Sequence, residues 1–277
     1  MISRLRPFPR RLPQRKRMTA IVGLQCTDGV LLLADTEETI SQESKGECDK
    51  LSLLQLPQGR VLIGGAGLSH FIEYAQQTIE RDFLVSSRSW PEILVDANTL
   101  FRKINRDTLG FYKGFASELV PEGIALLTAV NSNGHTTLYR WQNDSVVAVD
   151  PRKHDSVGCG IHQTYALLRE INIRMGADAM LFYGVRVMKQ AKRRVNGVGG
   201  KTEAVVLHHD GTAGYFSTGV TTQIEELIAE VDTFSSGSFL SLIADVYSKD
   251  EEFEHLLSQV ADKIRDYRKR YRQLRFR

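Results

Sequence analysis

The sequence predicts an α+β fold, a four-layer αββα sandwich with a helical extension at its C-terminal end. Three observations predict it: β-rich runs come in pairs joined by turn residues, helical apolar periodicity fills the stretches between them, and the order is strands, two helices, strands, two helices, strands. Two antiparallel sheets packed face to face, with helix pairs on their outer faces, would bury all these elements.

Two blocks of β-forming residues carry the strands. In the first, residues 19–24 and 30–34 flank Thr27-Asp28-Gly29, a sequence typical of a hairpin. In the second, the apolar run 124–130 leads to Asn133-Gly134, a strong hairpin signal. Further strands are predicted over residues 51–56, 61–63, 136–141, 146–149, 202–208 and 213–217.

Apolar residues with a helical period separate these blocks. One helix is predicted over residues 68–84, and a second begins at Pro91, because proline is favoured in the first position of a helix. Another pair is predicted over residues 161–173 and 177–195. Residues 150–158 are expected to form a loop.

Residues 1–18 differ from everything that follows. Residues 1–17 carry seven Lys or Arg, no acid and three of the seven prolines, so they cannot pack into a core. We expect a propeptide, a flexible arm, or a translation start that really lies at Met18. Because the whole chain has a net charge of +3, the remainder has −4, and nothing there indicates a nucleic-acid partner.

The main domain is expected to cover residues 19–220, with a helical extension over residues 221–277. Between residues 253 and 274 the apolar residues of the extension are spaced alternately by four and three, the period of paired helices. This helix either lies on its own domain or binds a partner. Its basic end as a nucleic-acid tail is the weakest interpretation.

Composition limits the class of protein. Three cysteines without paired spacing, Cys26, Cys48 and Cys159, fit a reducing compartment, and we expect a cytoplasmic protein. No apolar run approaches the roughly 18 residues that a membrane span needs, so no membrane association is expected. The histidines show no metal-binding spacing, and neither a metal nor a cofactor is expected.

Three segments near the start of the main domain carry the chemistry: Thr19-Ala-Ile-Val-Gly23, Ala34-Asp35-Thr36 and Lys50-Leu51, followed by Ala66-Gly67. Counted from Thr19 as the first residue, Asp35 is the seventeenth and Lys50 the thirty-second. This pattern resembles the amino-terminal third of an active proteasome β subunit. It is also similar to the peptidase subunit of the related bacterial ATP-dependent protease.

The resemblance covers residues 19–218 and implies a threonine-type endopeptidase with the N-terminal-nucleophile (Ntn) hydrolase fold. Thr19 would be the nucleophile once it is the first residue of the mature chain, and Asp35, Lys50 and Gly67 would complete the catalytic set. The resemblance also implies a ring of identical subunits around the sites, a polypeptide substrate, and an ATPase or regulatory partner.

These residue types suit acyl transfer. A threonine hydroxyl needs a base, and the α-amine of an N-terminal residue, with an ordinary pKa of about 7.7–8.0, can accept its proton near neutral pH. The Lys50 ammonium would lower the pKa values of its neighbours, and Asp35 would orient it. The Gly67 N–H, at a helix start, would stabilise the developing oxyanion.

Further roles are implied by the resemblance alone. Val157-Gly158-Cys159-Gly160 resembles the family's Gly-Ser-Gly turn, so Cys159 stands in place of a serine. Asn196 stands where an aspartate is expected, three residues before Gly199. The pocket for the substrate side chain before the scissile bond would be lined by Glu38, Thr39, Glu47 or Cys48, and Gly65. Its carboxylates predict cleavage after Arg or Lys.

Each of these residues also has an ordinary interpretation, as a strand threonine, a turn aspartate, a solvated lysine or a helix-start glycine. Three functions therefore stay open: a self-compartmentalised threonine peptidase, a catalytically inactive scaffold subunit of the same fold, and an Ntn amidase acting on small amides. Cys159 as a cysteine nucleophile is a weaker alternative, because a buried small apolar side chain explains it better.

Overall fold

The computed structural model describes most of the chain from residue 19 onward. The described ranges are 19–39, 45–56, 59–67, 69–84, 90–112, 124–142, 145–159, 161–171, 173–236 and 250–275. The basic segment 1–18, and with it the choice among a propeptide, an arm and an upstream start, lies outside them.

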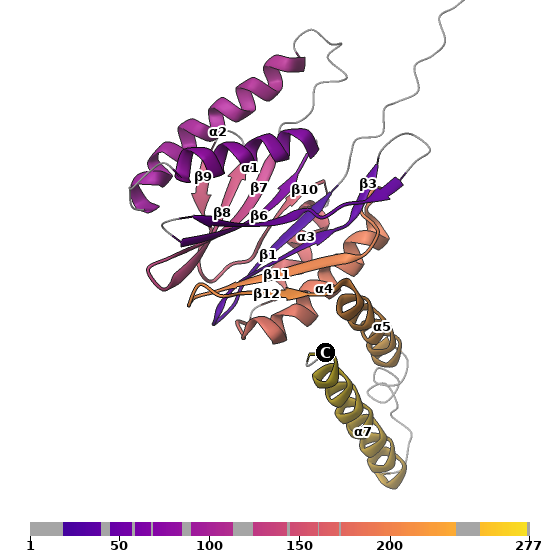
Figure 1. Cartoon of the computed structure of the whole chain (residues 1–277). Coiled ribbons are helices and arrows are strands. Elements are labelled where there is room, and N and C mark those ends of the chain that lie inside the picture. The colour runs from indigo at the N-terminus through magenta and orange to yellow at the C-terminus, as the bar shows by residue number, and fades with distance from the viewer. Residues whose placement is uncertain are drawn as a thin grey trace, which may run out of the picture.

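Two five-stranded antiparallel sheets form the centre of the fold (Figure 1). The first sheet, in the order β10-β1-β2-β11-β12, consists of β1 (Ala20–Gln25), β2 (Gly29–Asp35), β10 (Asp155–Gly158), β11 (Thr202–His208) and β12 (Ala213–Phe216). The second, in the order β5-β6-β7-β8-β9, consists of β5 (Leu51–Leu56), β6 (Gly59–Ala66), β7 (Ala125–Ser132), β8 (His135–Gln142) and β9 (Ser145–Ala148). A separate two-stranded ribbon follows β2 and pairs β3 (Glu37–Thr39) with β4 (Lys45–Glu47).

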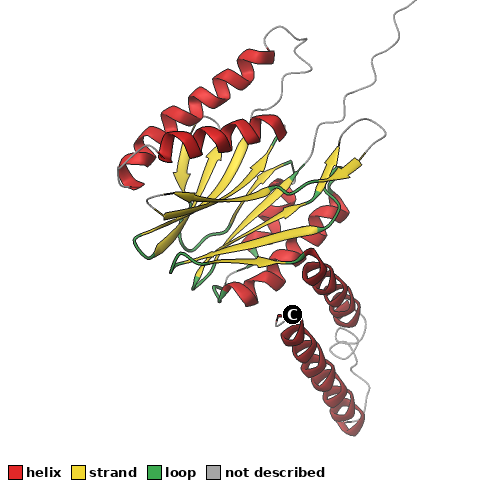
Figure 2. Cartoon of the chain, in the orientation of Figure 1, coloured by secondary structure: helices red, strands yellow, loops and turns green. Residues whose placement is uncertain are grey.

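Six helices are described, and five of them pack on one or the other of the two sheets (Figure 2). Helices α1 (Ser69–Leu84) and α2 (Trp90–Tyr112) contact the second sheet, and α3 (Ile161–Arg169) and α4 (Ala177–Arg194) contact the first. Helix α5 (Thr218–Phe234) packs against α4 and β11, and α7 (Asp250–Arg275) packs against α5. Among the described residues, no helix combines the length and apolarity needed to cross a bilayer.

Both faces of β2 are buried, which explains why its sequence is apolar almost throughout. Leu31 and Leu33 belong to the apolar cluster shared with α4, whereas Leu32 and Ala34 belong to the cluster that includes Leu62 of the second sheet. Successive side chains of a strand point to opposite faces, so a strand covered on both sides needs no polar alternation. A third cluster joins the second sheet to α1 and α2.

The sequence predicted two antiparallel sheets with helices between the strand blocks, and this is confirmed. Two elements were missed. Strand β10 has only four residues, two of them the polar Asp155 and Ser156, and it pairs with the start of β1. The β3–β4 ribbon lies in the polar stretch after Asp35. Such short strands are defined by the neighbours they pair with rather than by apolar alternation.

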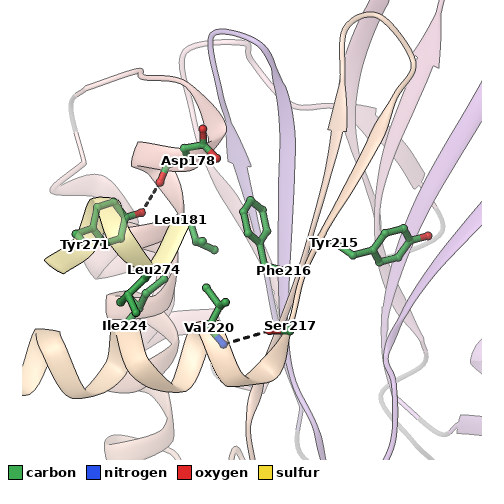
Figure 3. Close-up of a pocket in the computed structure, with 9 residues that line it drawn as sticks. All are labelled: Asp178, Leu181, Tyr215, Phe216, Ser217, Val220, Ile224, Tyr271 and Leu274. Carbon is green, nitrogen blue, oxygen red and sulfur yellow. Dashed lines mark hydrogen bonds between the residues drawn. The ribbon is translucent and has the colours of Figure 1, made fainter. Parts of the chain in front are cut away.

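Helix α7 packs onto its own domain through its C-terminal half. Tyr271 donates a hydrogen bond to the carbonyl of Asp178, beside a pocket of about 210 Å³ (Figure 3). Arg270 forms a two-pronged ion pair with Glu230 of α5 at 2.6 and 2.7 Å. The N-terminal half keeps apolar side chains in solvent, among them Phe253 and Leu257, which are 37% and 41% exposed. Only part of the row of apolar residues between 253 and 274 is therefore covered by the rest of the described chain.

The His154 side chain, placed beside the end of β1, generates a prediction about stability. Its Nδ1 accepts a hydrogen bond from the backbone N–H of Gln25 at 3.1 Å, so the neutral imidazole is the form that fits. Burial, helped by the Arg174 charge, lowers the pKa of His154 from 6.5 to about 4.

Because the unfolded chain binds a proton on His154 at higher pH than the folded chain, this group stabilises the fold above about pH 6.5 and loses that contribution as the pH falls to about 4. We expect the free energy of unfolding, from urea titrations at several pH values, to fall across this interval. His154→Gln should show a shallower fall. An equal pH dependence in both proteins would contradict the assignment.

Candidate active site

Thr19 directly precedes β1 and is buried, with 8% of its surface exposed. Its carbonyl oxygen accepts a hydrogen bond from the Cys159 backbone N–H at 3.0 Å and is contacted by the Cys159 Sγ at 3.4 Å. The predicted Cys159 position therefore lies next to Thr19, where it contacts the main chain of the threonine. Pairing of β10 with β1 brings the two residues together, because Ala20 lies opposite Gly158.

Asp35, the last residue of β2, is completely buried beside Thr19. The hairpin register places Ile21 opposite Ala34, so the next residue of β2 reaches the start of β1. Its Oδ1 accepts a hydrogen bond from the Ala20 N–H at 2.9 Å, and its Oδ2 accepts one from the Gly199 N–H at 3.3 Å. Asp35 thus joins β1, β2 and the turn before β11.

Lys50 immediately precedes β5, the edge strand of the second sheet, and its ammonium reaches across to the first. Its Nζ lies 3.3 Å from the Thr19 Oγ1, 3.0 Å from the Asp35 Oδ2 and 2.7 Å from the Glu37 carbonyl oxygen. An ammonium has three protons, and these three acceptors can take all of them. The side chain is only 8% exposed, so the geometry is held inside the protein.

The Asp35–Lys50 pair balances two buried charges. Burial raises the pKa of the Asp35 carboxyl, while the Lys50 ammonium and the N–H groups of Ala20 and Gly199 act in the opposite direction. A buried ion pair is stable only when hydrogen bonds satisfy the remaining polar positions, and here both Asp35 oxygens have partners. The threonine hydroxyl therefore faces a fixed cation.

Gly67 lies between β6 and α1 with φ 135°, a conformation that favours glycine. The preceding residue, Ala66, lies near Thr19 on the other side of Gly158, whose φ is 104°. A Cβ added to Gly158 would lie 2.0 Å from the Thr19 carbonyl oxygen and 3.3 Å from the Ala66 Cβ. Gly158 thus lies between Thr19 and the last residue of β6, in a space that has no room for a side chain.

The remaining predicted residues lie in different surroundings. Gly199, besides its bond to Asp35, packs so closely on Glu37 that an added Cβ would lie 2.4 Å from the carboxylate. Asn196 is exposed in the turn after α4. An added Cβ on Gly65 would lie 2.4 Å from Ile72 of α1, so this glycine makes room for helix packing.

Of the residues predicted to line the substrate pocket, Glu38 and Thr39 can be placed only by their backbone. Glu38 and Thr39 form part of β3, paired with Gly46 and Lys45, and their side chains lie outside the described atoms. Glu47 is exposed and forms an ion pair with Lys201 at 3.2 Å. Glu37, the first residue of β3, accepts from the Lys50 ammonium through its carbonyl oxygen, so the β3–β4 ribbon begins beside Lys50.

Sequence reasoning missed Glu203 of β11. Its Oε2 accepts hydrogen bonds from the backbone N–H groups of Lys50 at 2.9 Å and Leu51 at 3.3 Å. The signal available in the sequence was a lone glutamate directly before the apolar run 204–207 of β11. Among the described residues, no group of three or more His, Cys, Asp or Glu side chains could hold a metal ion.

Comparisons with known proteins show the fold. No family model and no curated protein matches the chain. The solved structure of Anbu (ancestral beta-subunit) from Yersinia bercovieri is similar, with a TM-score of 0.63 and 12% identity over 83% of this chain and 99% of that chain. The helical assembly of the Anbu complex from Pseudomonas aeruginosa gives 0.61 and 12% identity over 84% and 99%. Anbu from Hyphomicrobium sp. strain MC1 gives 0.60 and 11% identity over 83% and 99%.

The assignment to the proteasome β-subunit family, made from the sequence, is wrong at the level of the family. The similar structures are those of Anbu, a distinct proteasome-related family, and no model of a proteasome β-subunit family matches. At 11–13% identity the likeness shows a shared proteasome-like, Ntn-type fold.

The contact between Gly158 and Thr19 generates a prediction. Gly158→Ala places a Cβ against the Thr19 carbonyl in a conformation that costs non-glycine residues energy, so we expect a loss of about 2 kcal/mol or more in the free energy of unfolding. Gly110→Ala is the matched control, because an added Cβ there meets nothing within 4 Å on helix α2. It should stabilise the protein by about 0.5 kcal/mol. Equal effects in chemical denaturation would contradict this geometry.

Proposed function

We propose that this chain is a threonine-type Ntn hydrolase that cleaves peptide bonds through an acyl-enzyme on Thr19. The observation that carries the proposal is the Lys50 ammonium, held between the Thr19 hydroxyl and the buried Asp35 carboxylate. The Anbu-like fold supports it, because Anbu proteins have the proteasome-like, Ntn-type fold. The proposed architecture is a four-layer sandwich over residues 19–220, with the helical extension 221–277 outside it.

The mechanism requires that Thr19 become the first residue of the chain. Its free α-amine then accepts the Oγ1 proton, directly or through one water, as Oγ1 attacks the substrate carbonyl carbon. The amine returns that proton to the leaving amino group when the peptide bond breaks. Water, activated by the same amine, then hydrolyses the ester, which frees the Thr19 hydroxyl for another cycle.

The residues around Thr19 divide the remaining tasks. The Lys50 ammonium, 3.3 Å from the Thr19 Oγ1, favours the deprotonated form of that hydroxyl. Asp35 fixes that ammonium and, through the Ala20 N–H, the backbone next to the nucleophile. The Gly67 N–H is proposed to receive the oxyanion, and Cys159 to hold the Thr19 main chain.

The substrate pocket is proposed to lie along the β3–β4 ribbon. Glu38, Thr39 and Glu47 belong to this ribbon, and carboxylates there would favour a cationic side chain, so cleavage after Arg or Lys is proposed. A cytoplasmic location, a polypeptide substrate and an ATPase or regulatory partner complete the proposal. The alternatives are an inactive scaffold subunit and an amidase for small amides, which peptide and small-amide assays distinguish.

The catalytic proposal is tested by substitutions in a chain that begins at Thr19. Thr19→Ala should abolish hydrolysis of fluorogenic peptides, and Lys50→Ala and Asp35→Asn should each lower kcat by about 10²–10³. Asp155→Asn is the matched control, because Asp155 is also a buried, ion-paired aspartate but its partner is Arg140. It should keep kcat near the starting value. Full activity in Thr19→Ala would refute the mechanism.

We also propose that the chain self-associates, since the similar Pseudomonas aeruginosa structure is described as a helical assembly. Whether copies of this 31.2 kDa chain close into a ring or form an open helix, several must come together to enclose the sites. Multi-angle light scattering should give a mass well above that of a single chain, of roughly six copies or more. A monomer at micromolar concentration would contradict the proposal.

A further inference from the structure

Glu203 is a carboxylate in a row of apolar side chains. In β11, Val205 and Leu207 point between the two sheets, whereas Ala204 and Val206 point toward the helices. Successive side chains alternate, so Glu203 belongs to the row between the sheets. It lies opposite Ala34, one residue before Asp35 in β2. A charged group is thus placed at the end of the apolar layer, next to the candidate active site.

One oxygen of this carboxylate binds the backbone that carries Lys50. The Oε2 of Glu203 accepts from the Lys50 N–H at 2.9 Å and from the Leu51 N–H at 3.3 Å. Lys50 directly precedes β5, the edge strand of the second sheet, and Leu51 is its first residue, whereas Glu203 belongs to the first sheet. The bonds therefore tie the two sheets together at the residue whose ammonium lies beside Thr19.

The environment of Glu203 opposes its charge. Burial raises the pKa of the Glu203 carboxyl, and the nearby Asp49 charge acts in the same direction, while the two N–H groups and the Lys50 charge favour ionisation. Hydrogen bonds from N–H groups to a carboxylate are stronger than those to a neutral acceptor, which offsets part of the cost of burial. An apolar residue would fill this row without that cost.

The position of Lys50 explains what the carboxylate contributes. The three acceptors of the ammonium lie on Thr19, before β1, on Asp35 of β2 and on Glu37 of β3. The Lys50 backbone instead leads directly into β5 of the second sheet. A lysine side chain has four flexible carbons, so a shift of its backbone would move the ammonium away from Thr19. Fixing the backbone at Glu203 sets the distance that the side chain must span.

We propose that Glu203 is a positioning residue for Lys50: its carboxylate holds the Lys50 and Leu51 N–H groups so that the ammonium meets Thr19 and Asp35 together. The inference rests on the proposed function, since it assigns Glu203 a part in the same site. It acts through Lys50 and contacts no reacting atom.

Two variants separate position from charge. Glu203→Gln loses the charge but keeps an amide oxygen that can accept both N–H bonds, whereas Glu203→Leu keeps the size and removes the acceptor. We expect Glu203→Leu to lower kcat about 10- to 100-fold with little change in KM, the scale of a 1 Å misplacement of a catalytic group. Glu203→Gln should keep kcat within about threefold of the parent. It keeps both hydrogen bonds and loses only the difference between a charged and a neutral acceptor.

A second measurement does not depend on activity. Reductive methylation of lysines, followed by peptide mass analysis, reports whether the Lys50 ammonium is held in its buried site, where it is 8% exposed. Lys50 should be protected in the parent protein and in Glu203→Gln, and should be modified in Glu203→Leu. Glu225→Leu is the matched control, since Glu225 accepts from Thr202 of the same strand and from Lys192, away from Lys50. It should leave both kcat and Lys50 protection unchanged.

The outcomes separate the two proposals. If Glu203→Gln is as impaired as Glu203→Leu, the charge matters rather than the position, and the inference is wrong. It is equally wrong if Lys50 stays protected in Glu203→Leu. If the parent protein hydrolyses nothing but Lys50 protection follows the expected pattern, the proposed function fails while the positioning of Lys50 by Glu203 stands.

Discussion

The ion pair between Lys50 and Asp35 is the interaction on which the candidate site depends. It joins the two sheets at one end, because Asp35 ends β2 of the first sheet and Lys50 directly precedes β5 of the second. Both charges are buried, so neither could be kept without the other. Thr19 directly precedes β1, and its hydroxyl is one of the two other acceptors of the lysine, together with the Glu37 carbonyl.

The rest of the fold keeps that pair in place. Sheet pairing sets the relative positions of Thr19 and Asp35, and the apolar cluster between the sheets, with Ile21, Leu32 and Leu62, sets the spacing that Lys50 crosses. The helices on the outer faces complete this arrangement, because strands buried on both faces need apolar cover on each side. Glycines at the contact points, above all Gly158, allow backbones to approach closely enough for the site to form.

Much of this could be predicted from the sequence, for physical reasons. The β1–β2 hairpin brings residues 19 and 35 together through local turn chemistry, and the apolar run of β2 shows that it is buried on both sides. Strand β10 could not be predicted, because its polar residues become a strand only when β1 is beside them. Glu203 was missed since its partners lie about 150 residues away, in another sheet. The family was misjudged because the resemblance to proteasome β subunits rested on the few residues around Thr19. The likeness to Anbu is one of the whole fold.

Catalysis by Thr19 requires a free α-amine, and the mass of the chain isolated from its own organism shows whether it has one. Intact-mass analysis with sequencing of the first peptide determines the first residue. We expect the mature chain to begin at Thr19, so that the Lys50 ammonium faces a residue carrying both a hydroxyl and an amine. A protein that retains Met18 or any residue before it, yet hydrolyses peptides, would refute catalysis by a free Thr19 amine.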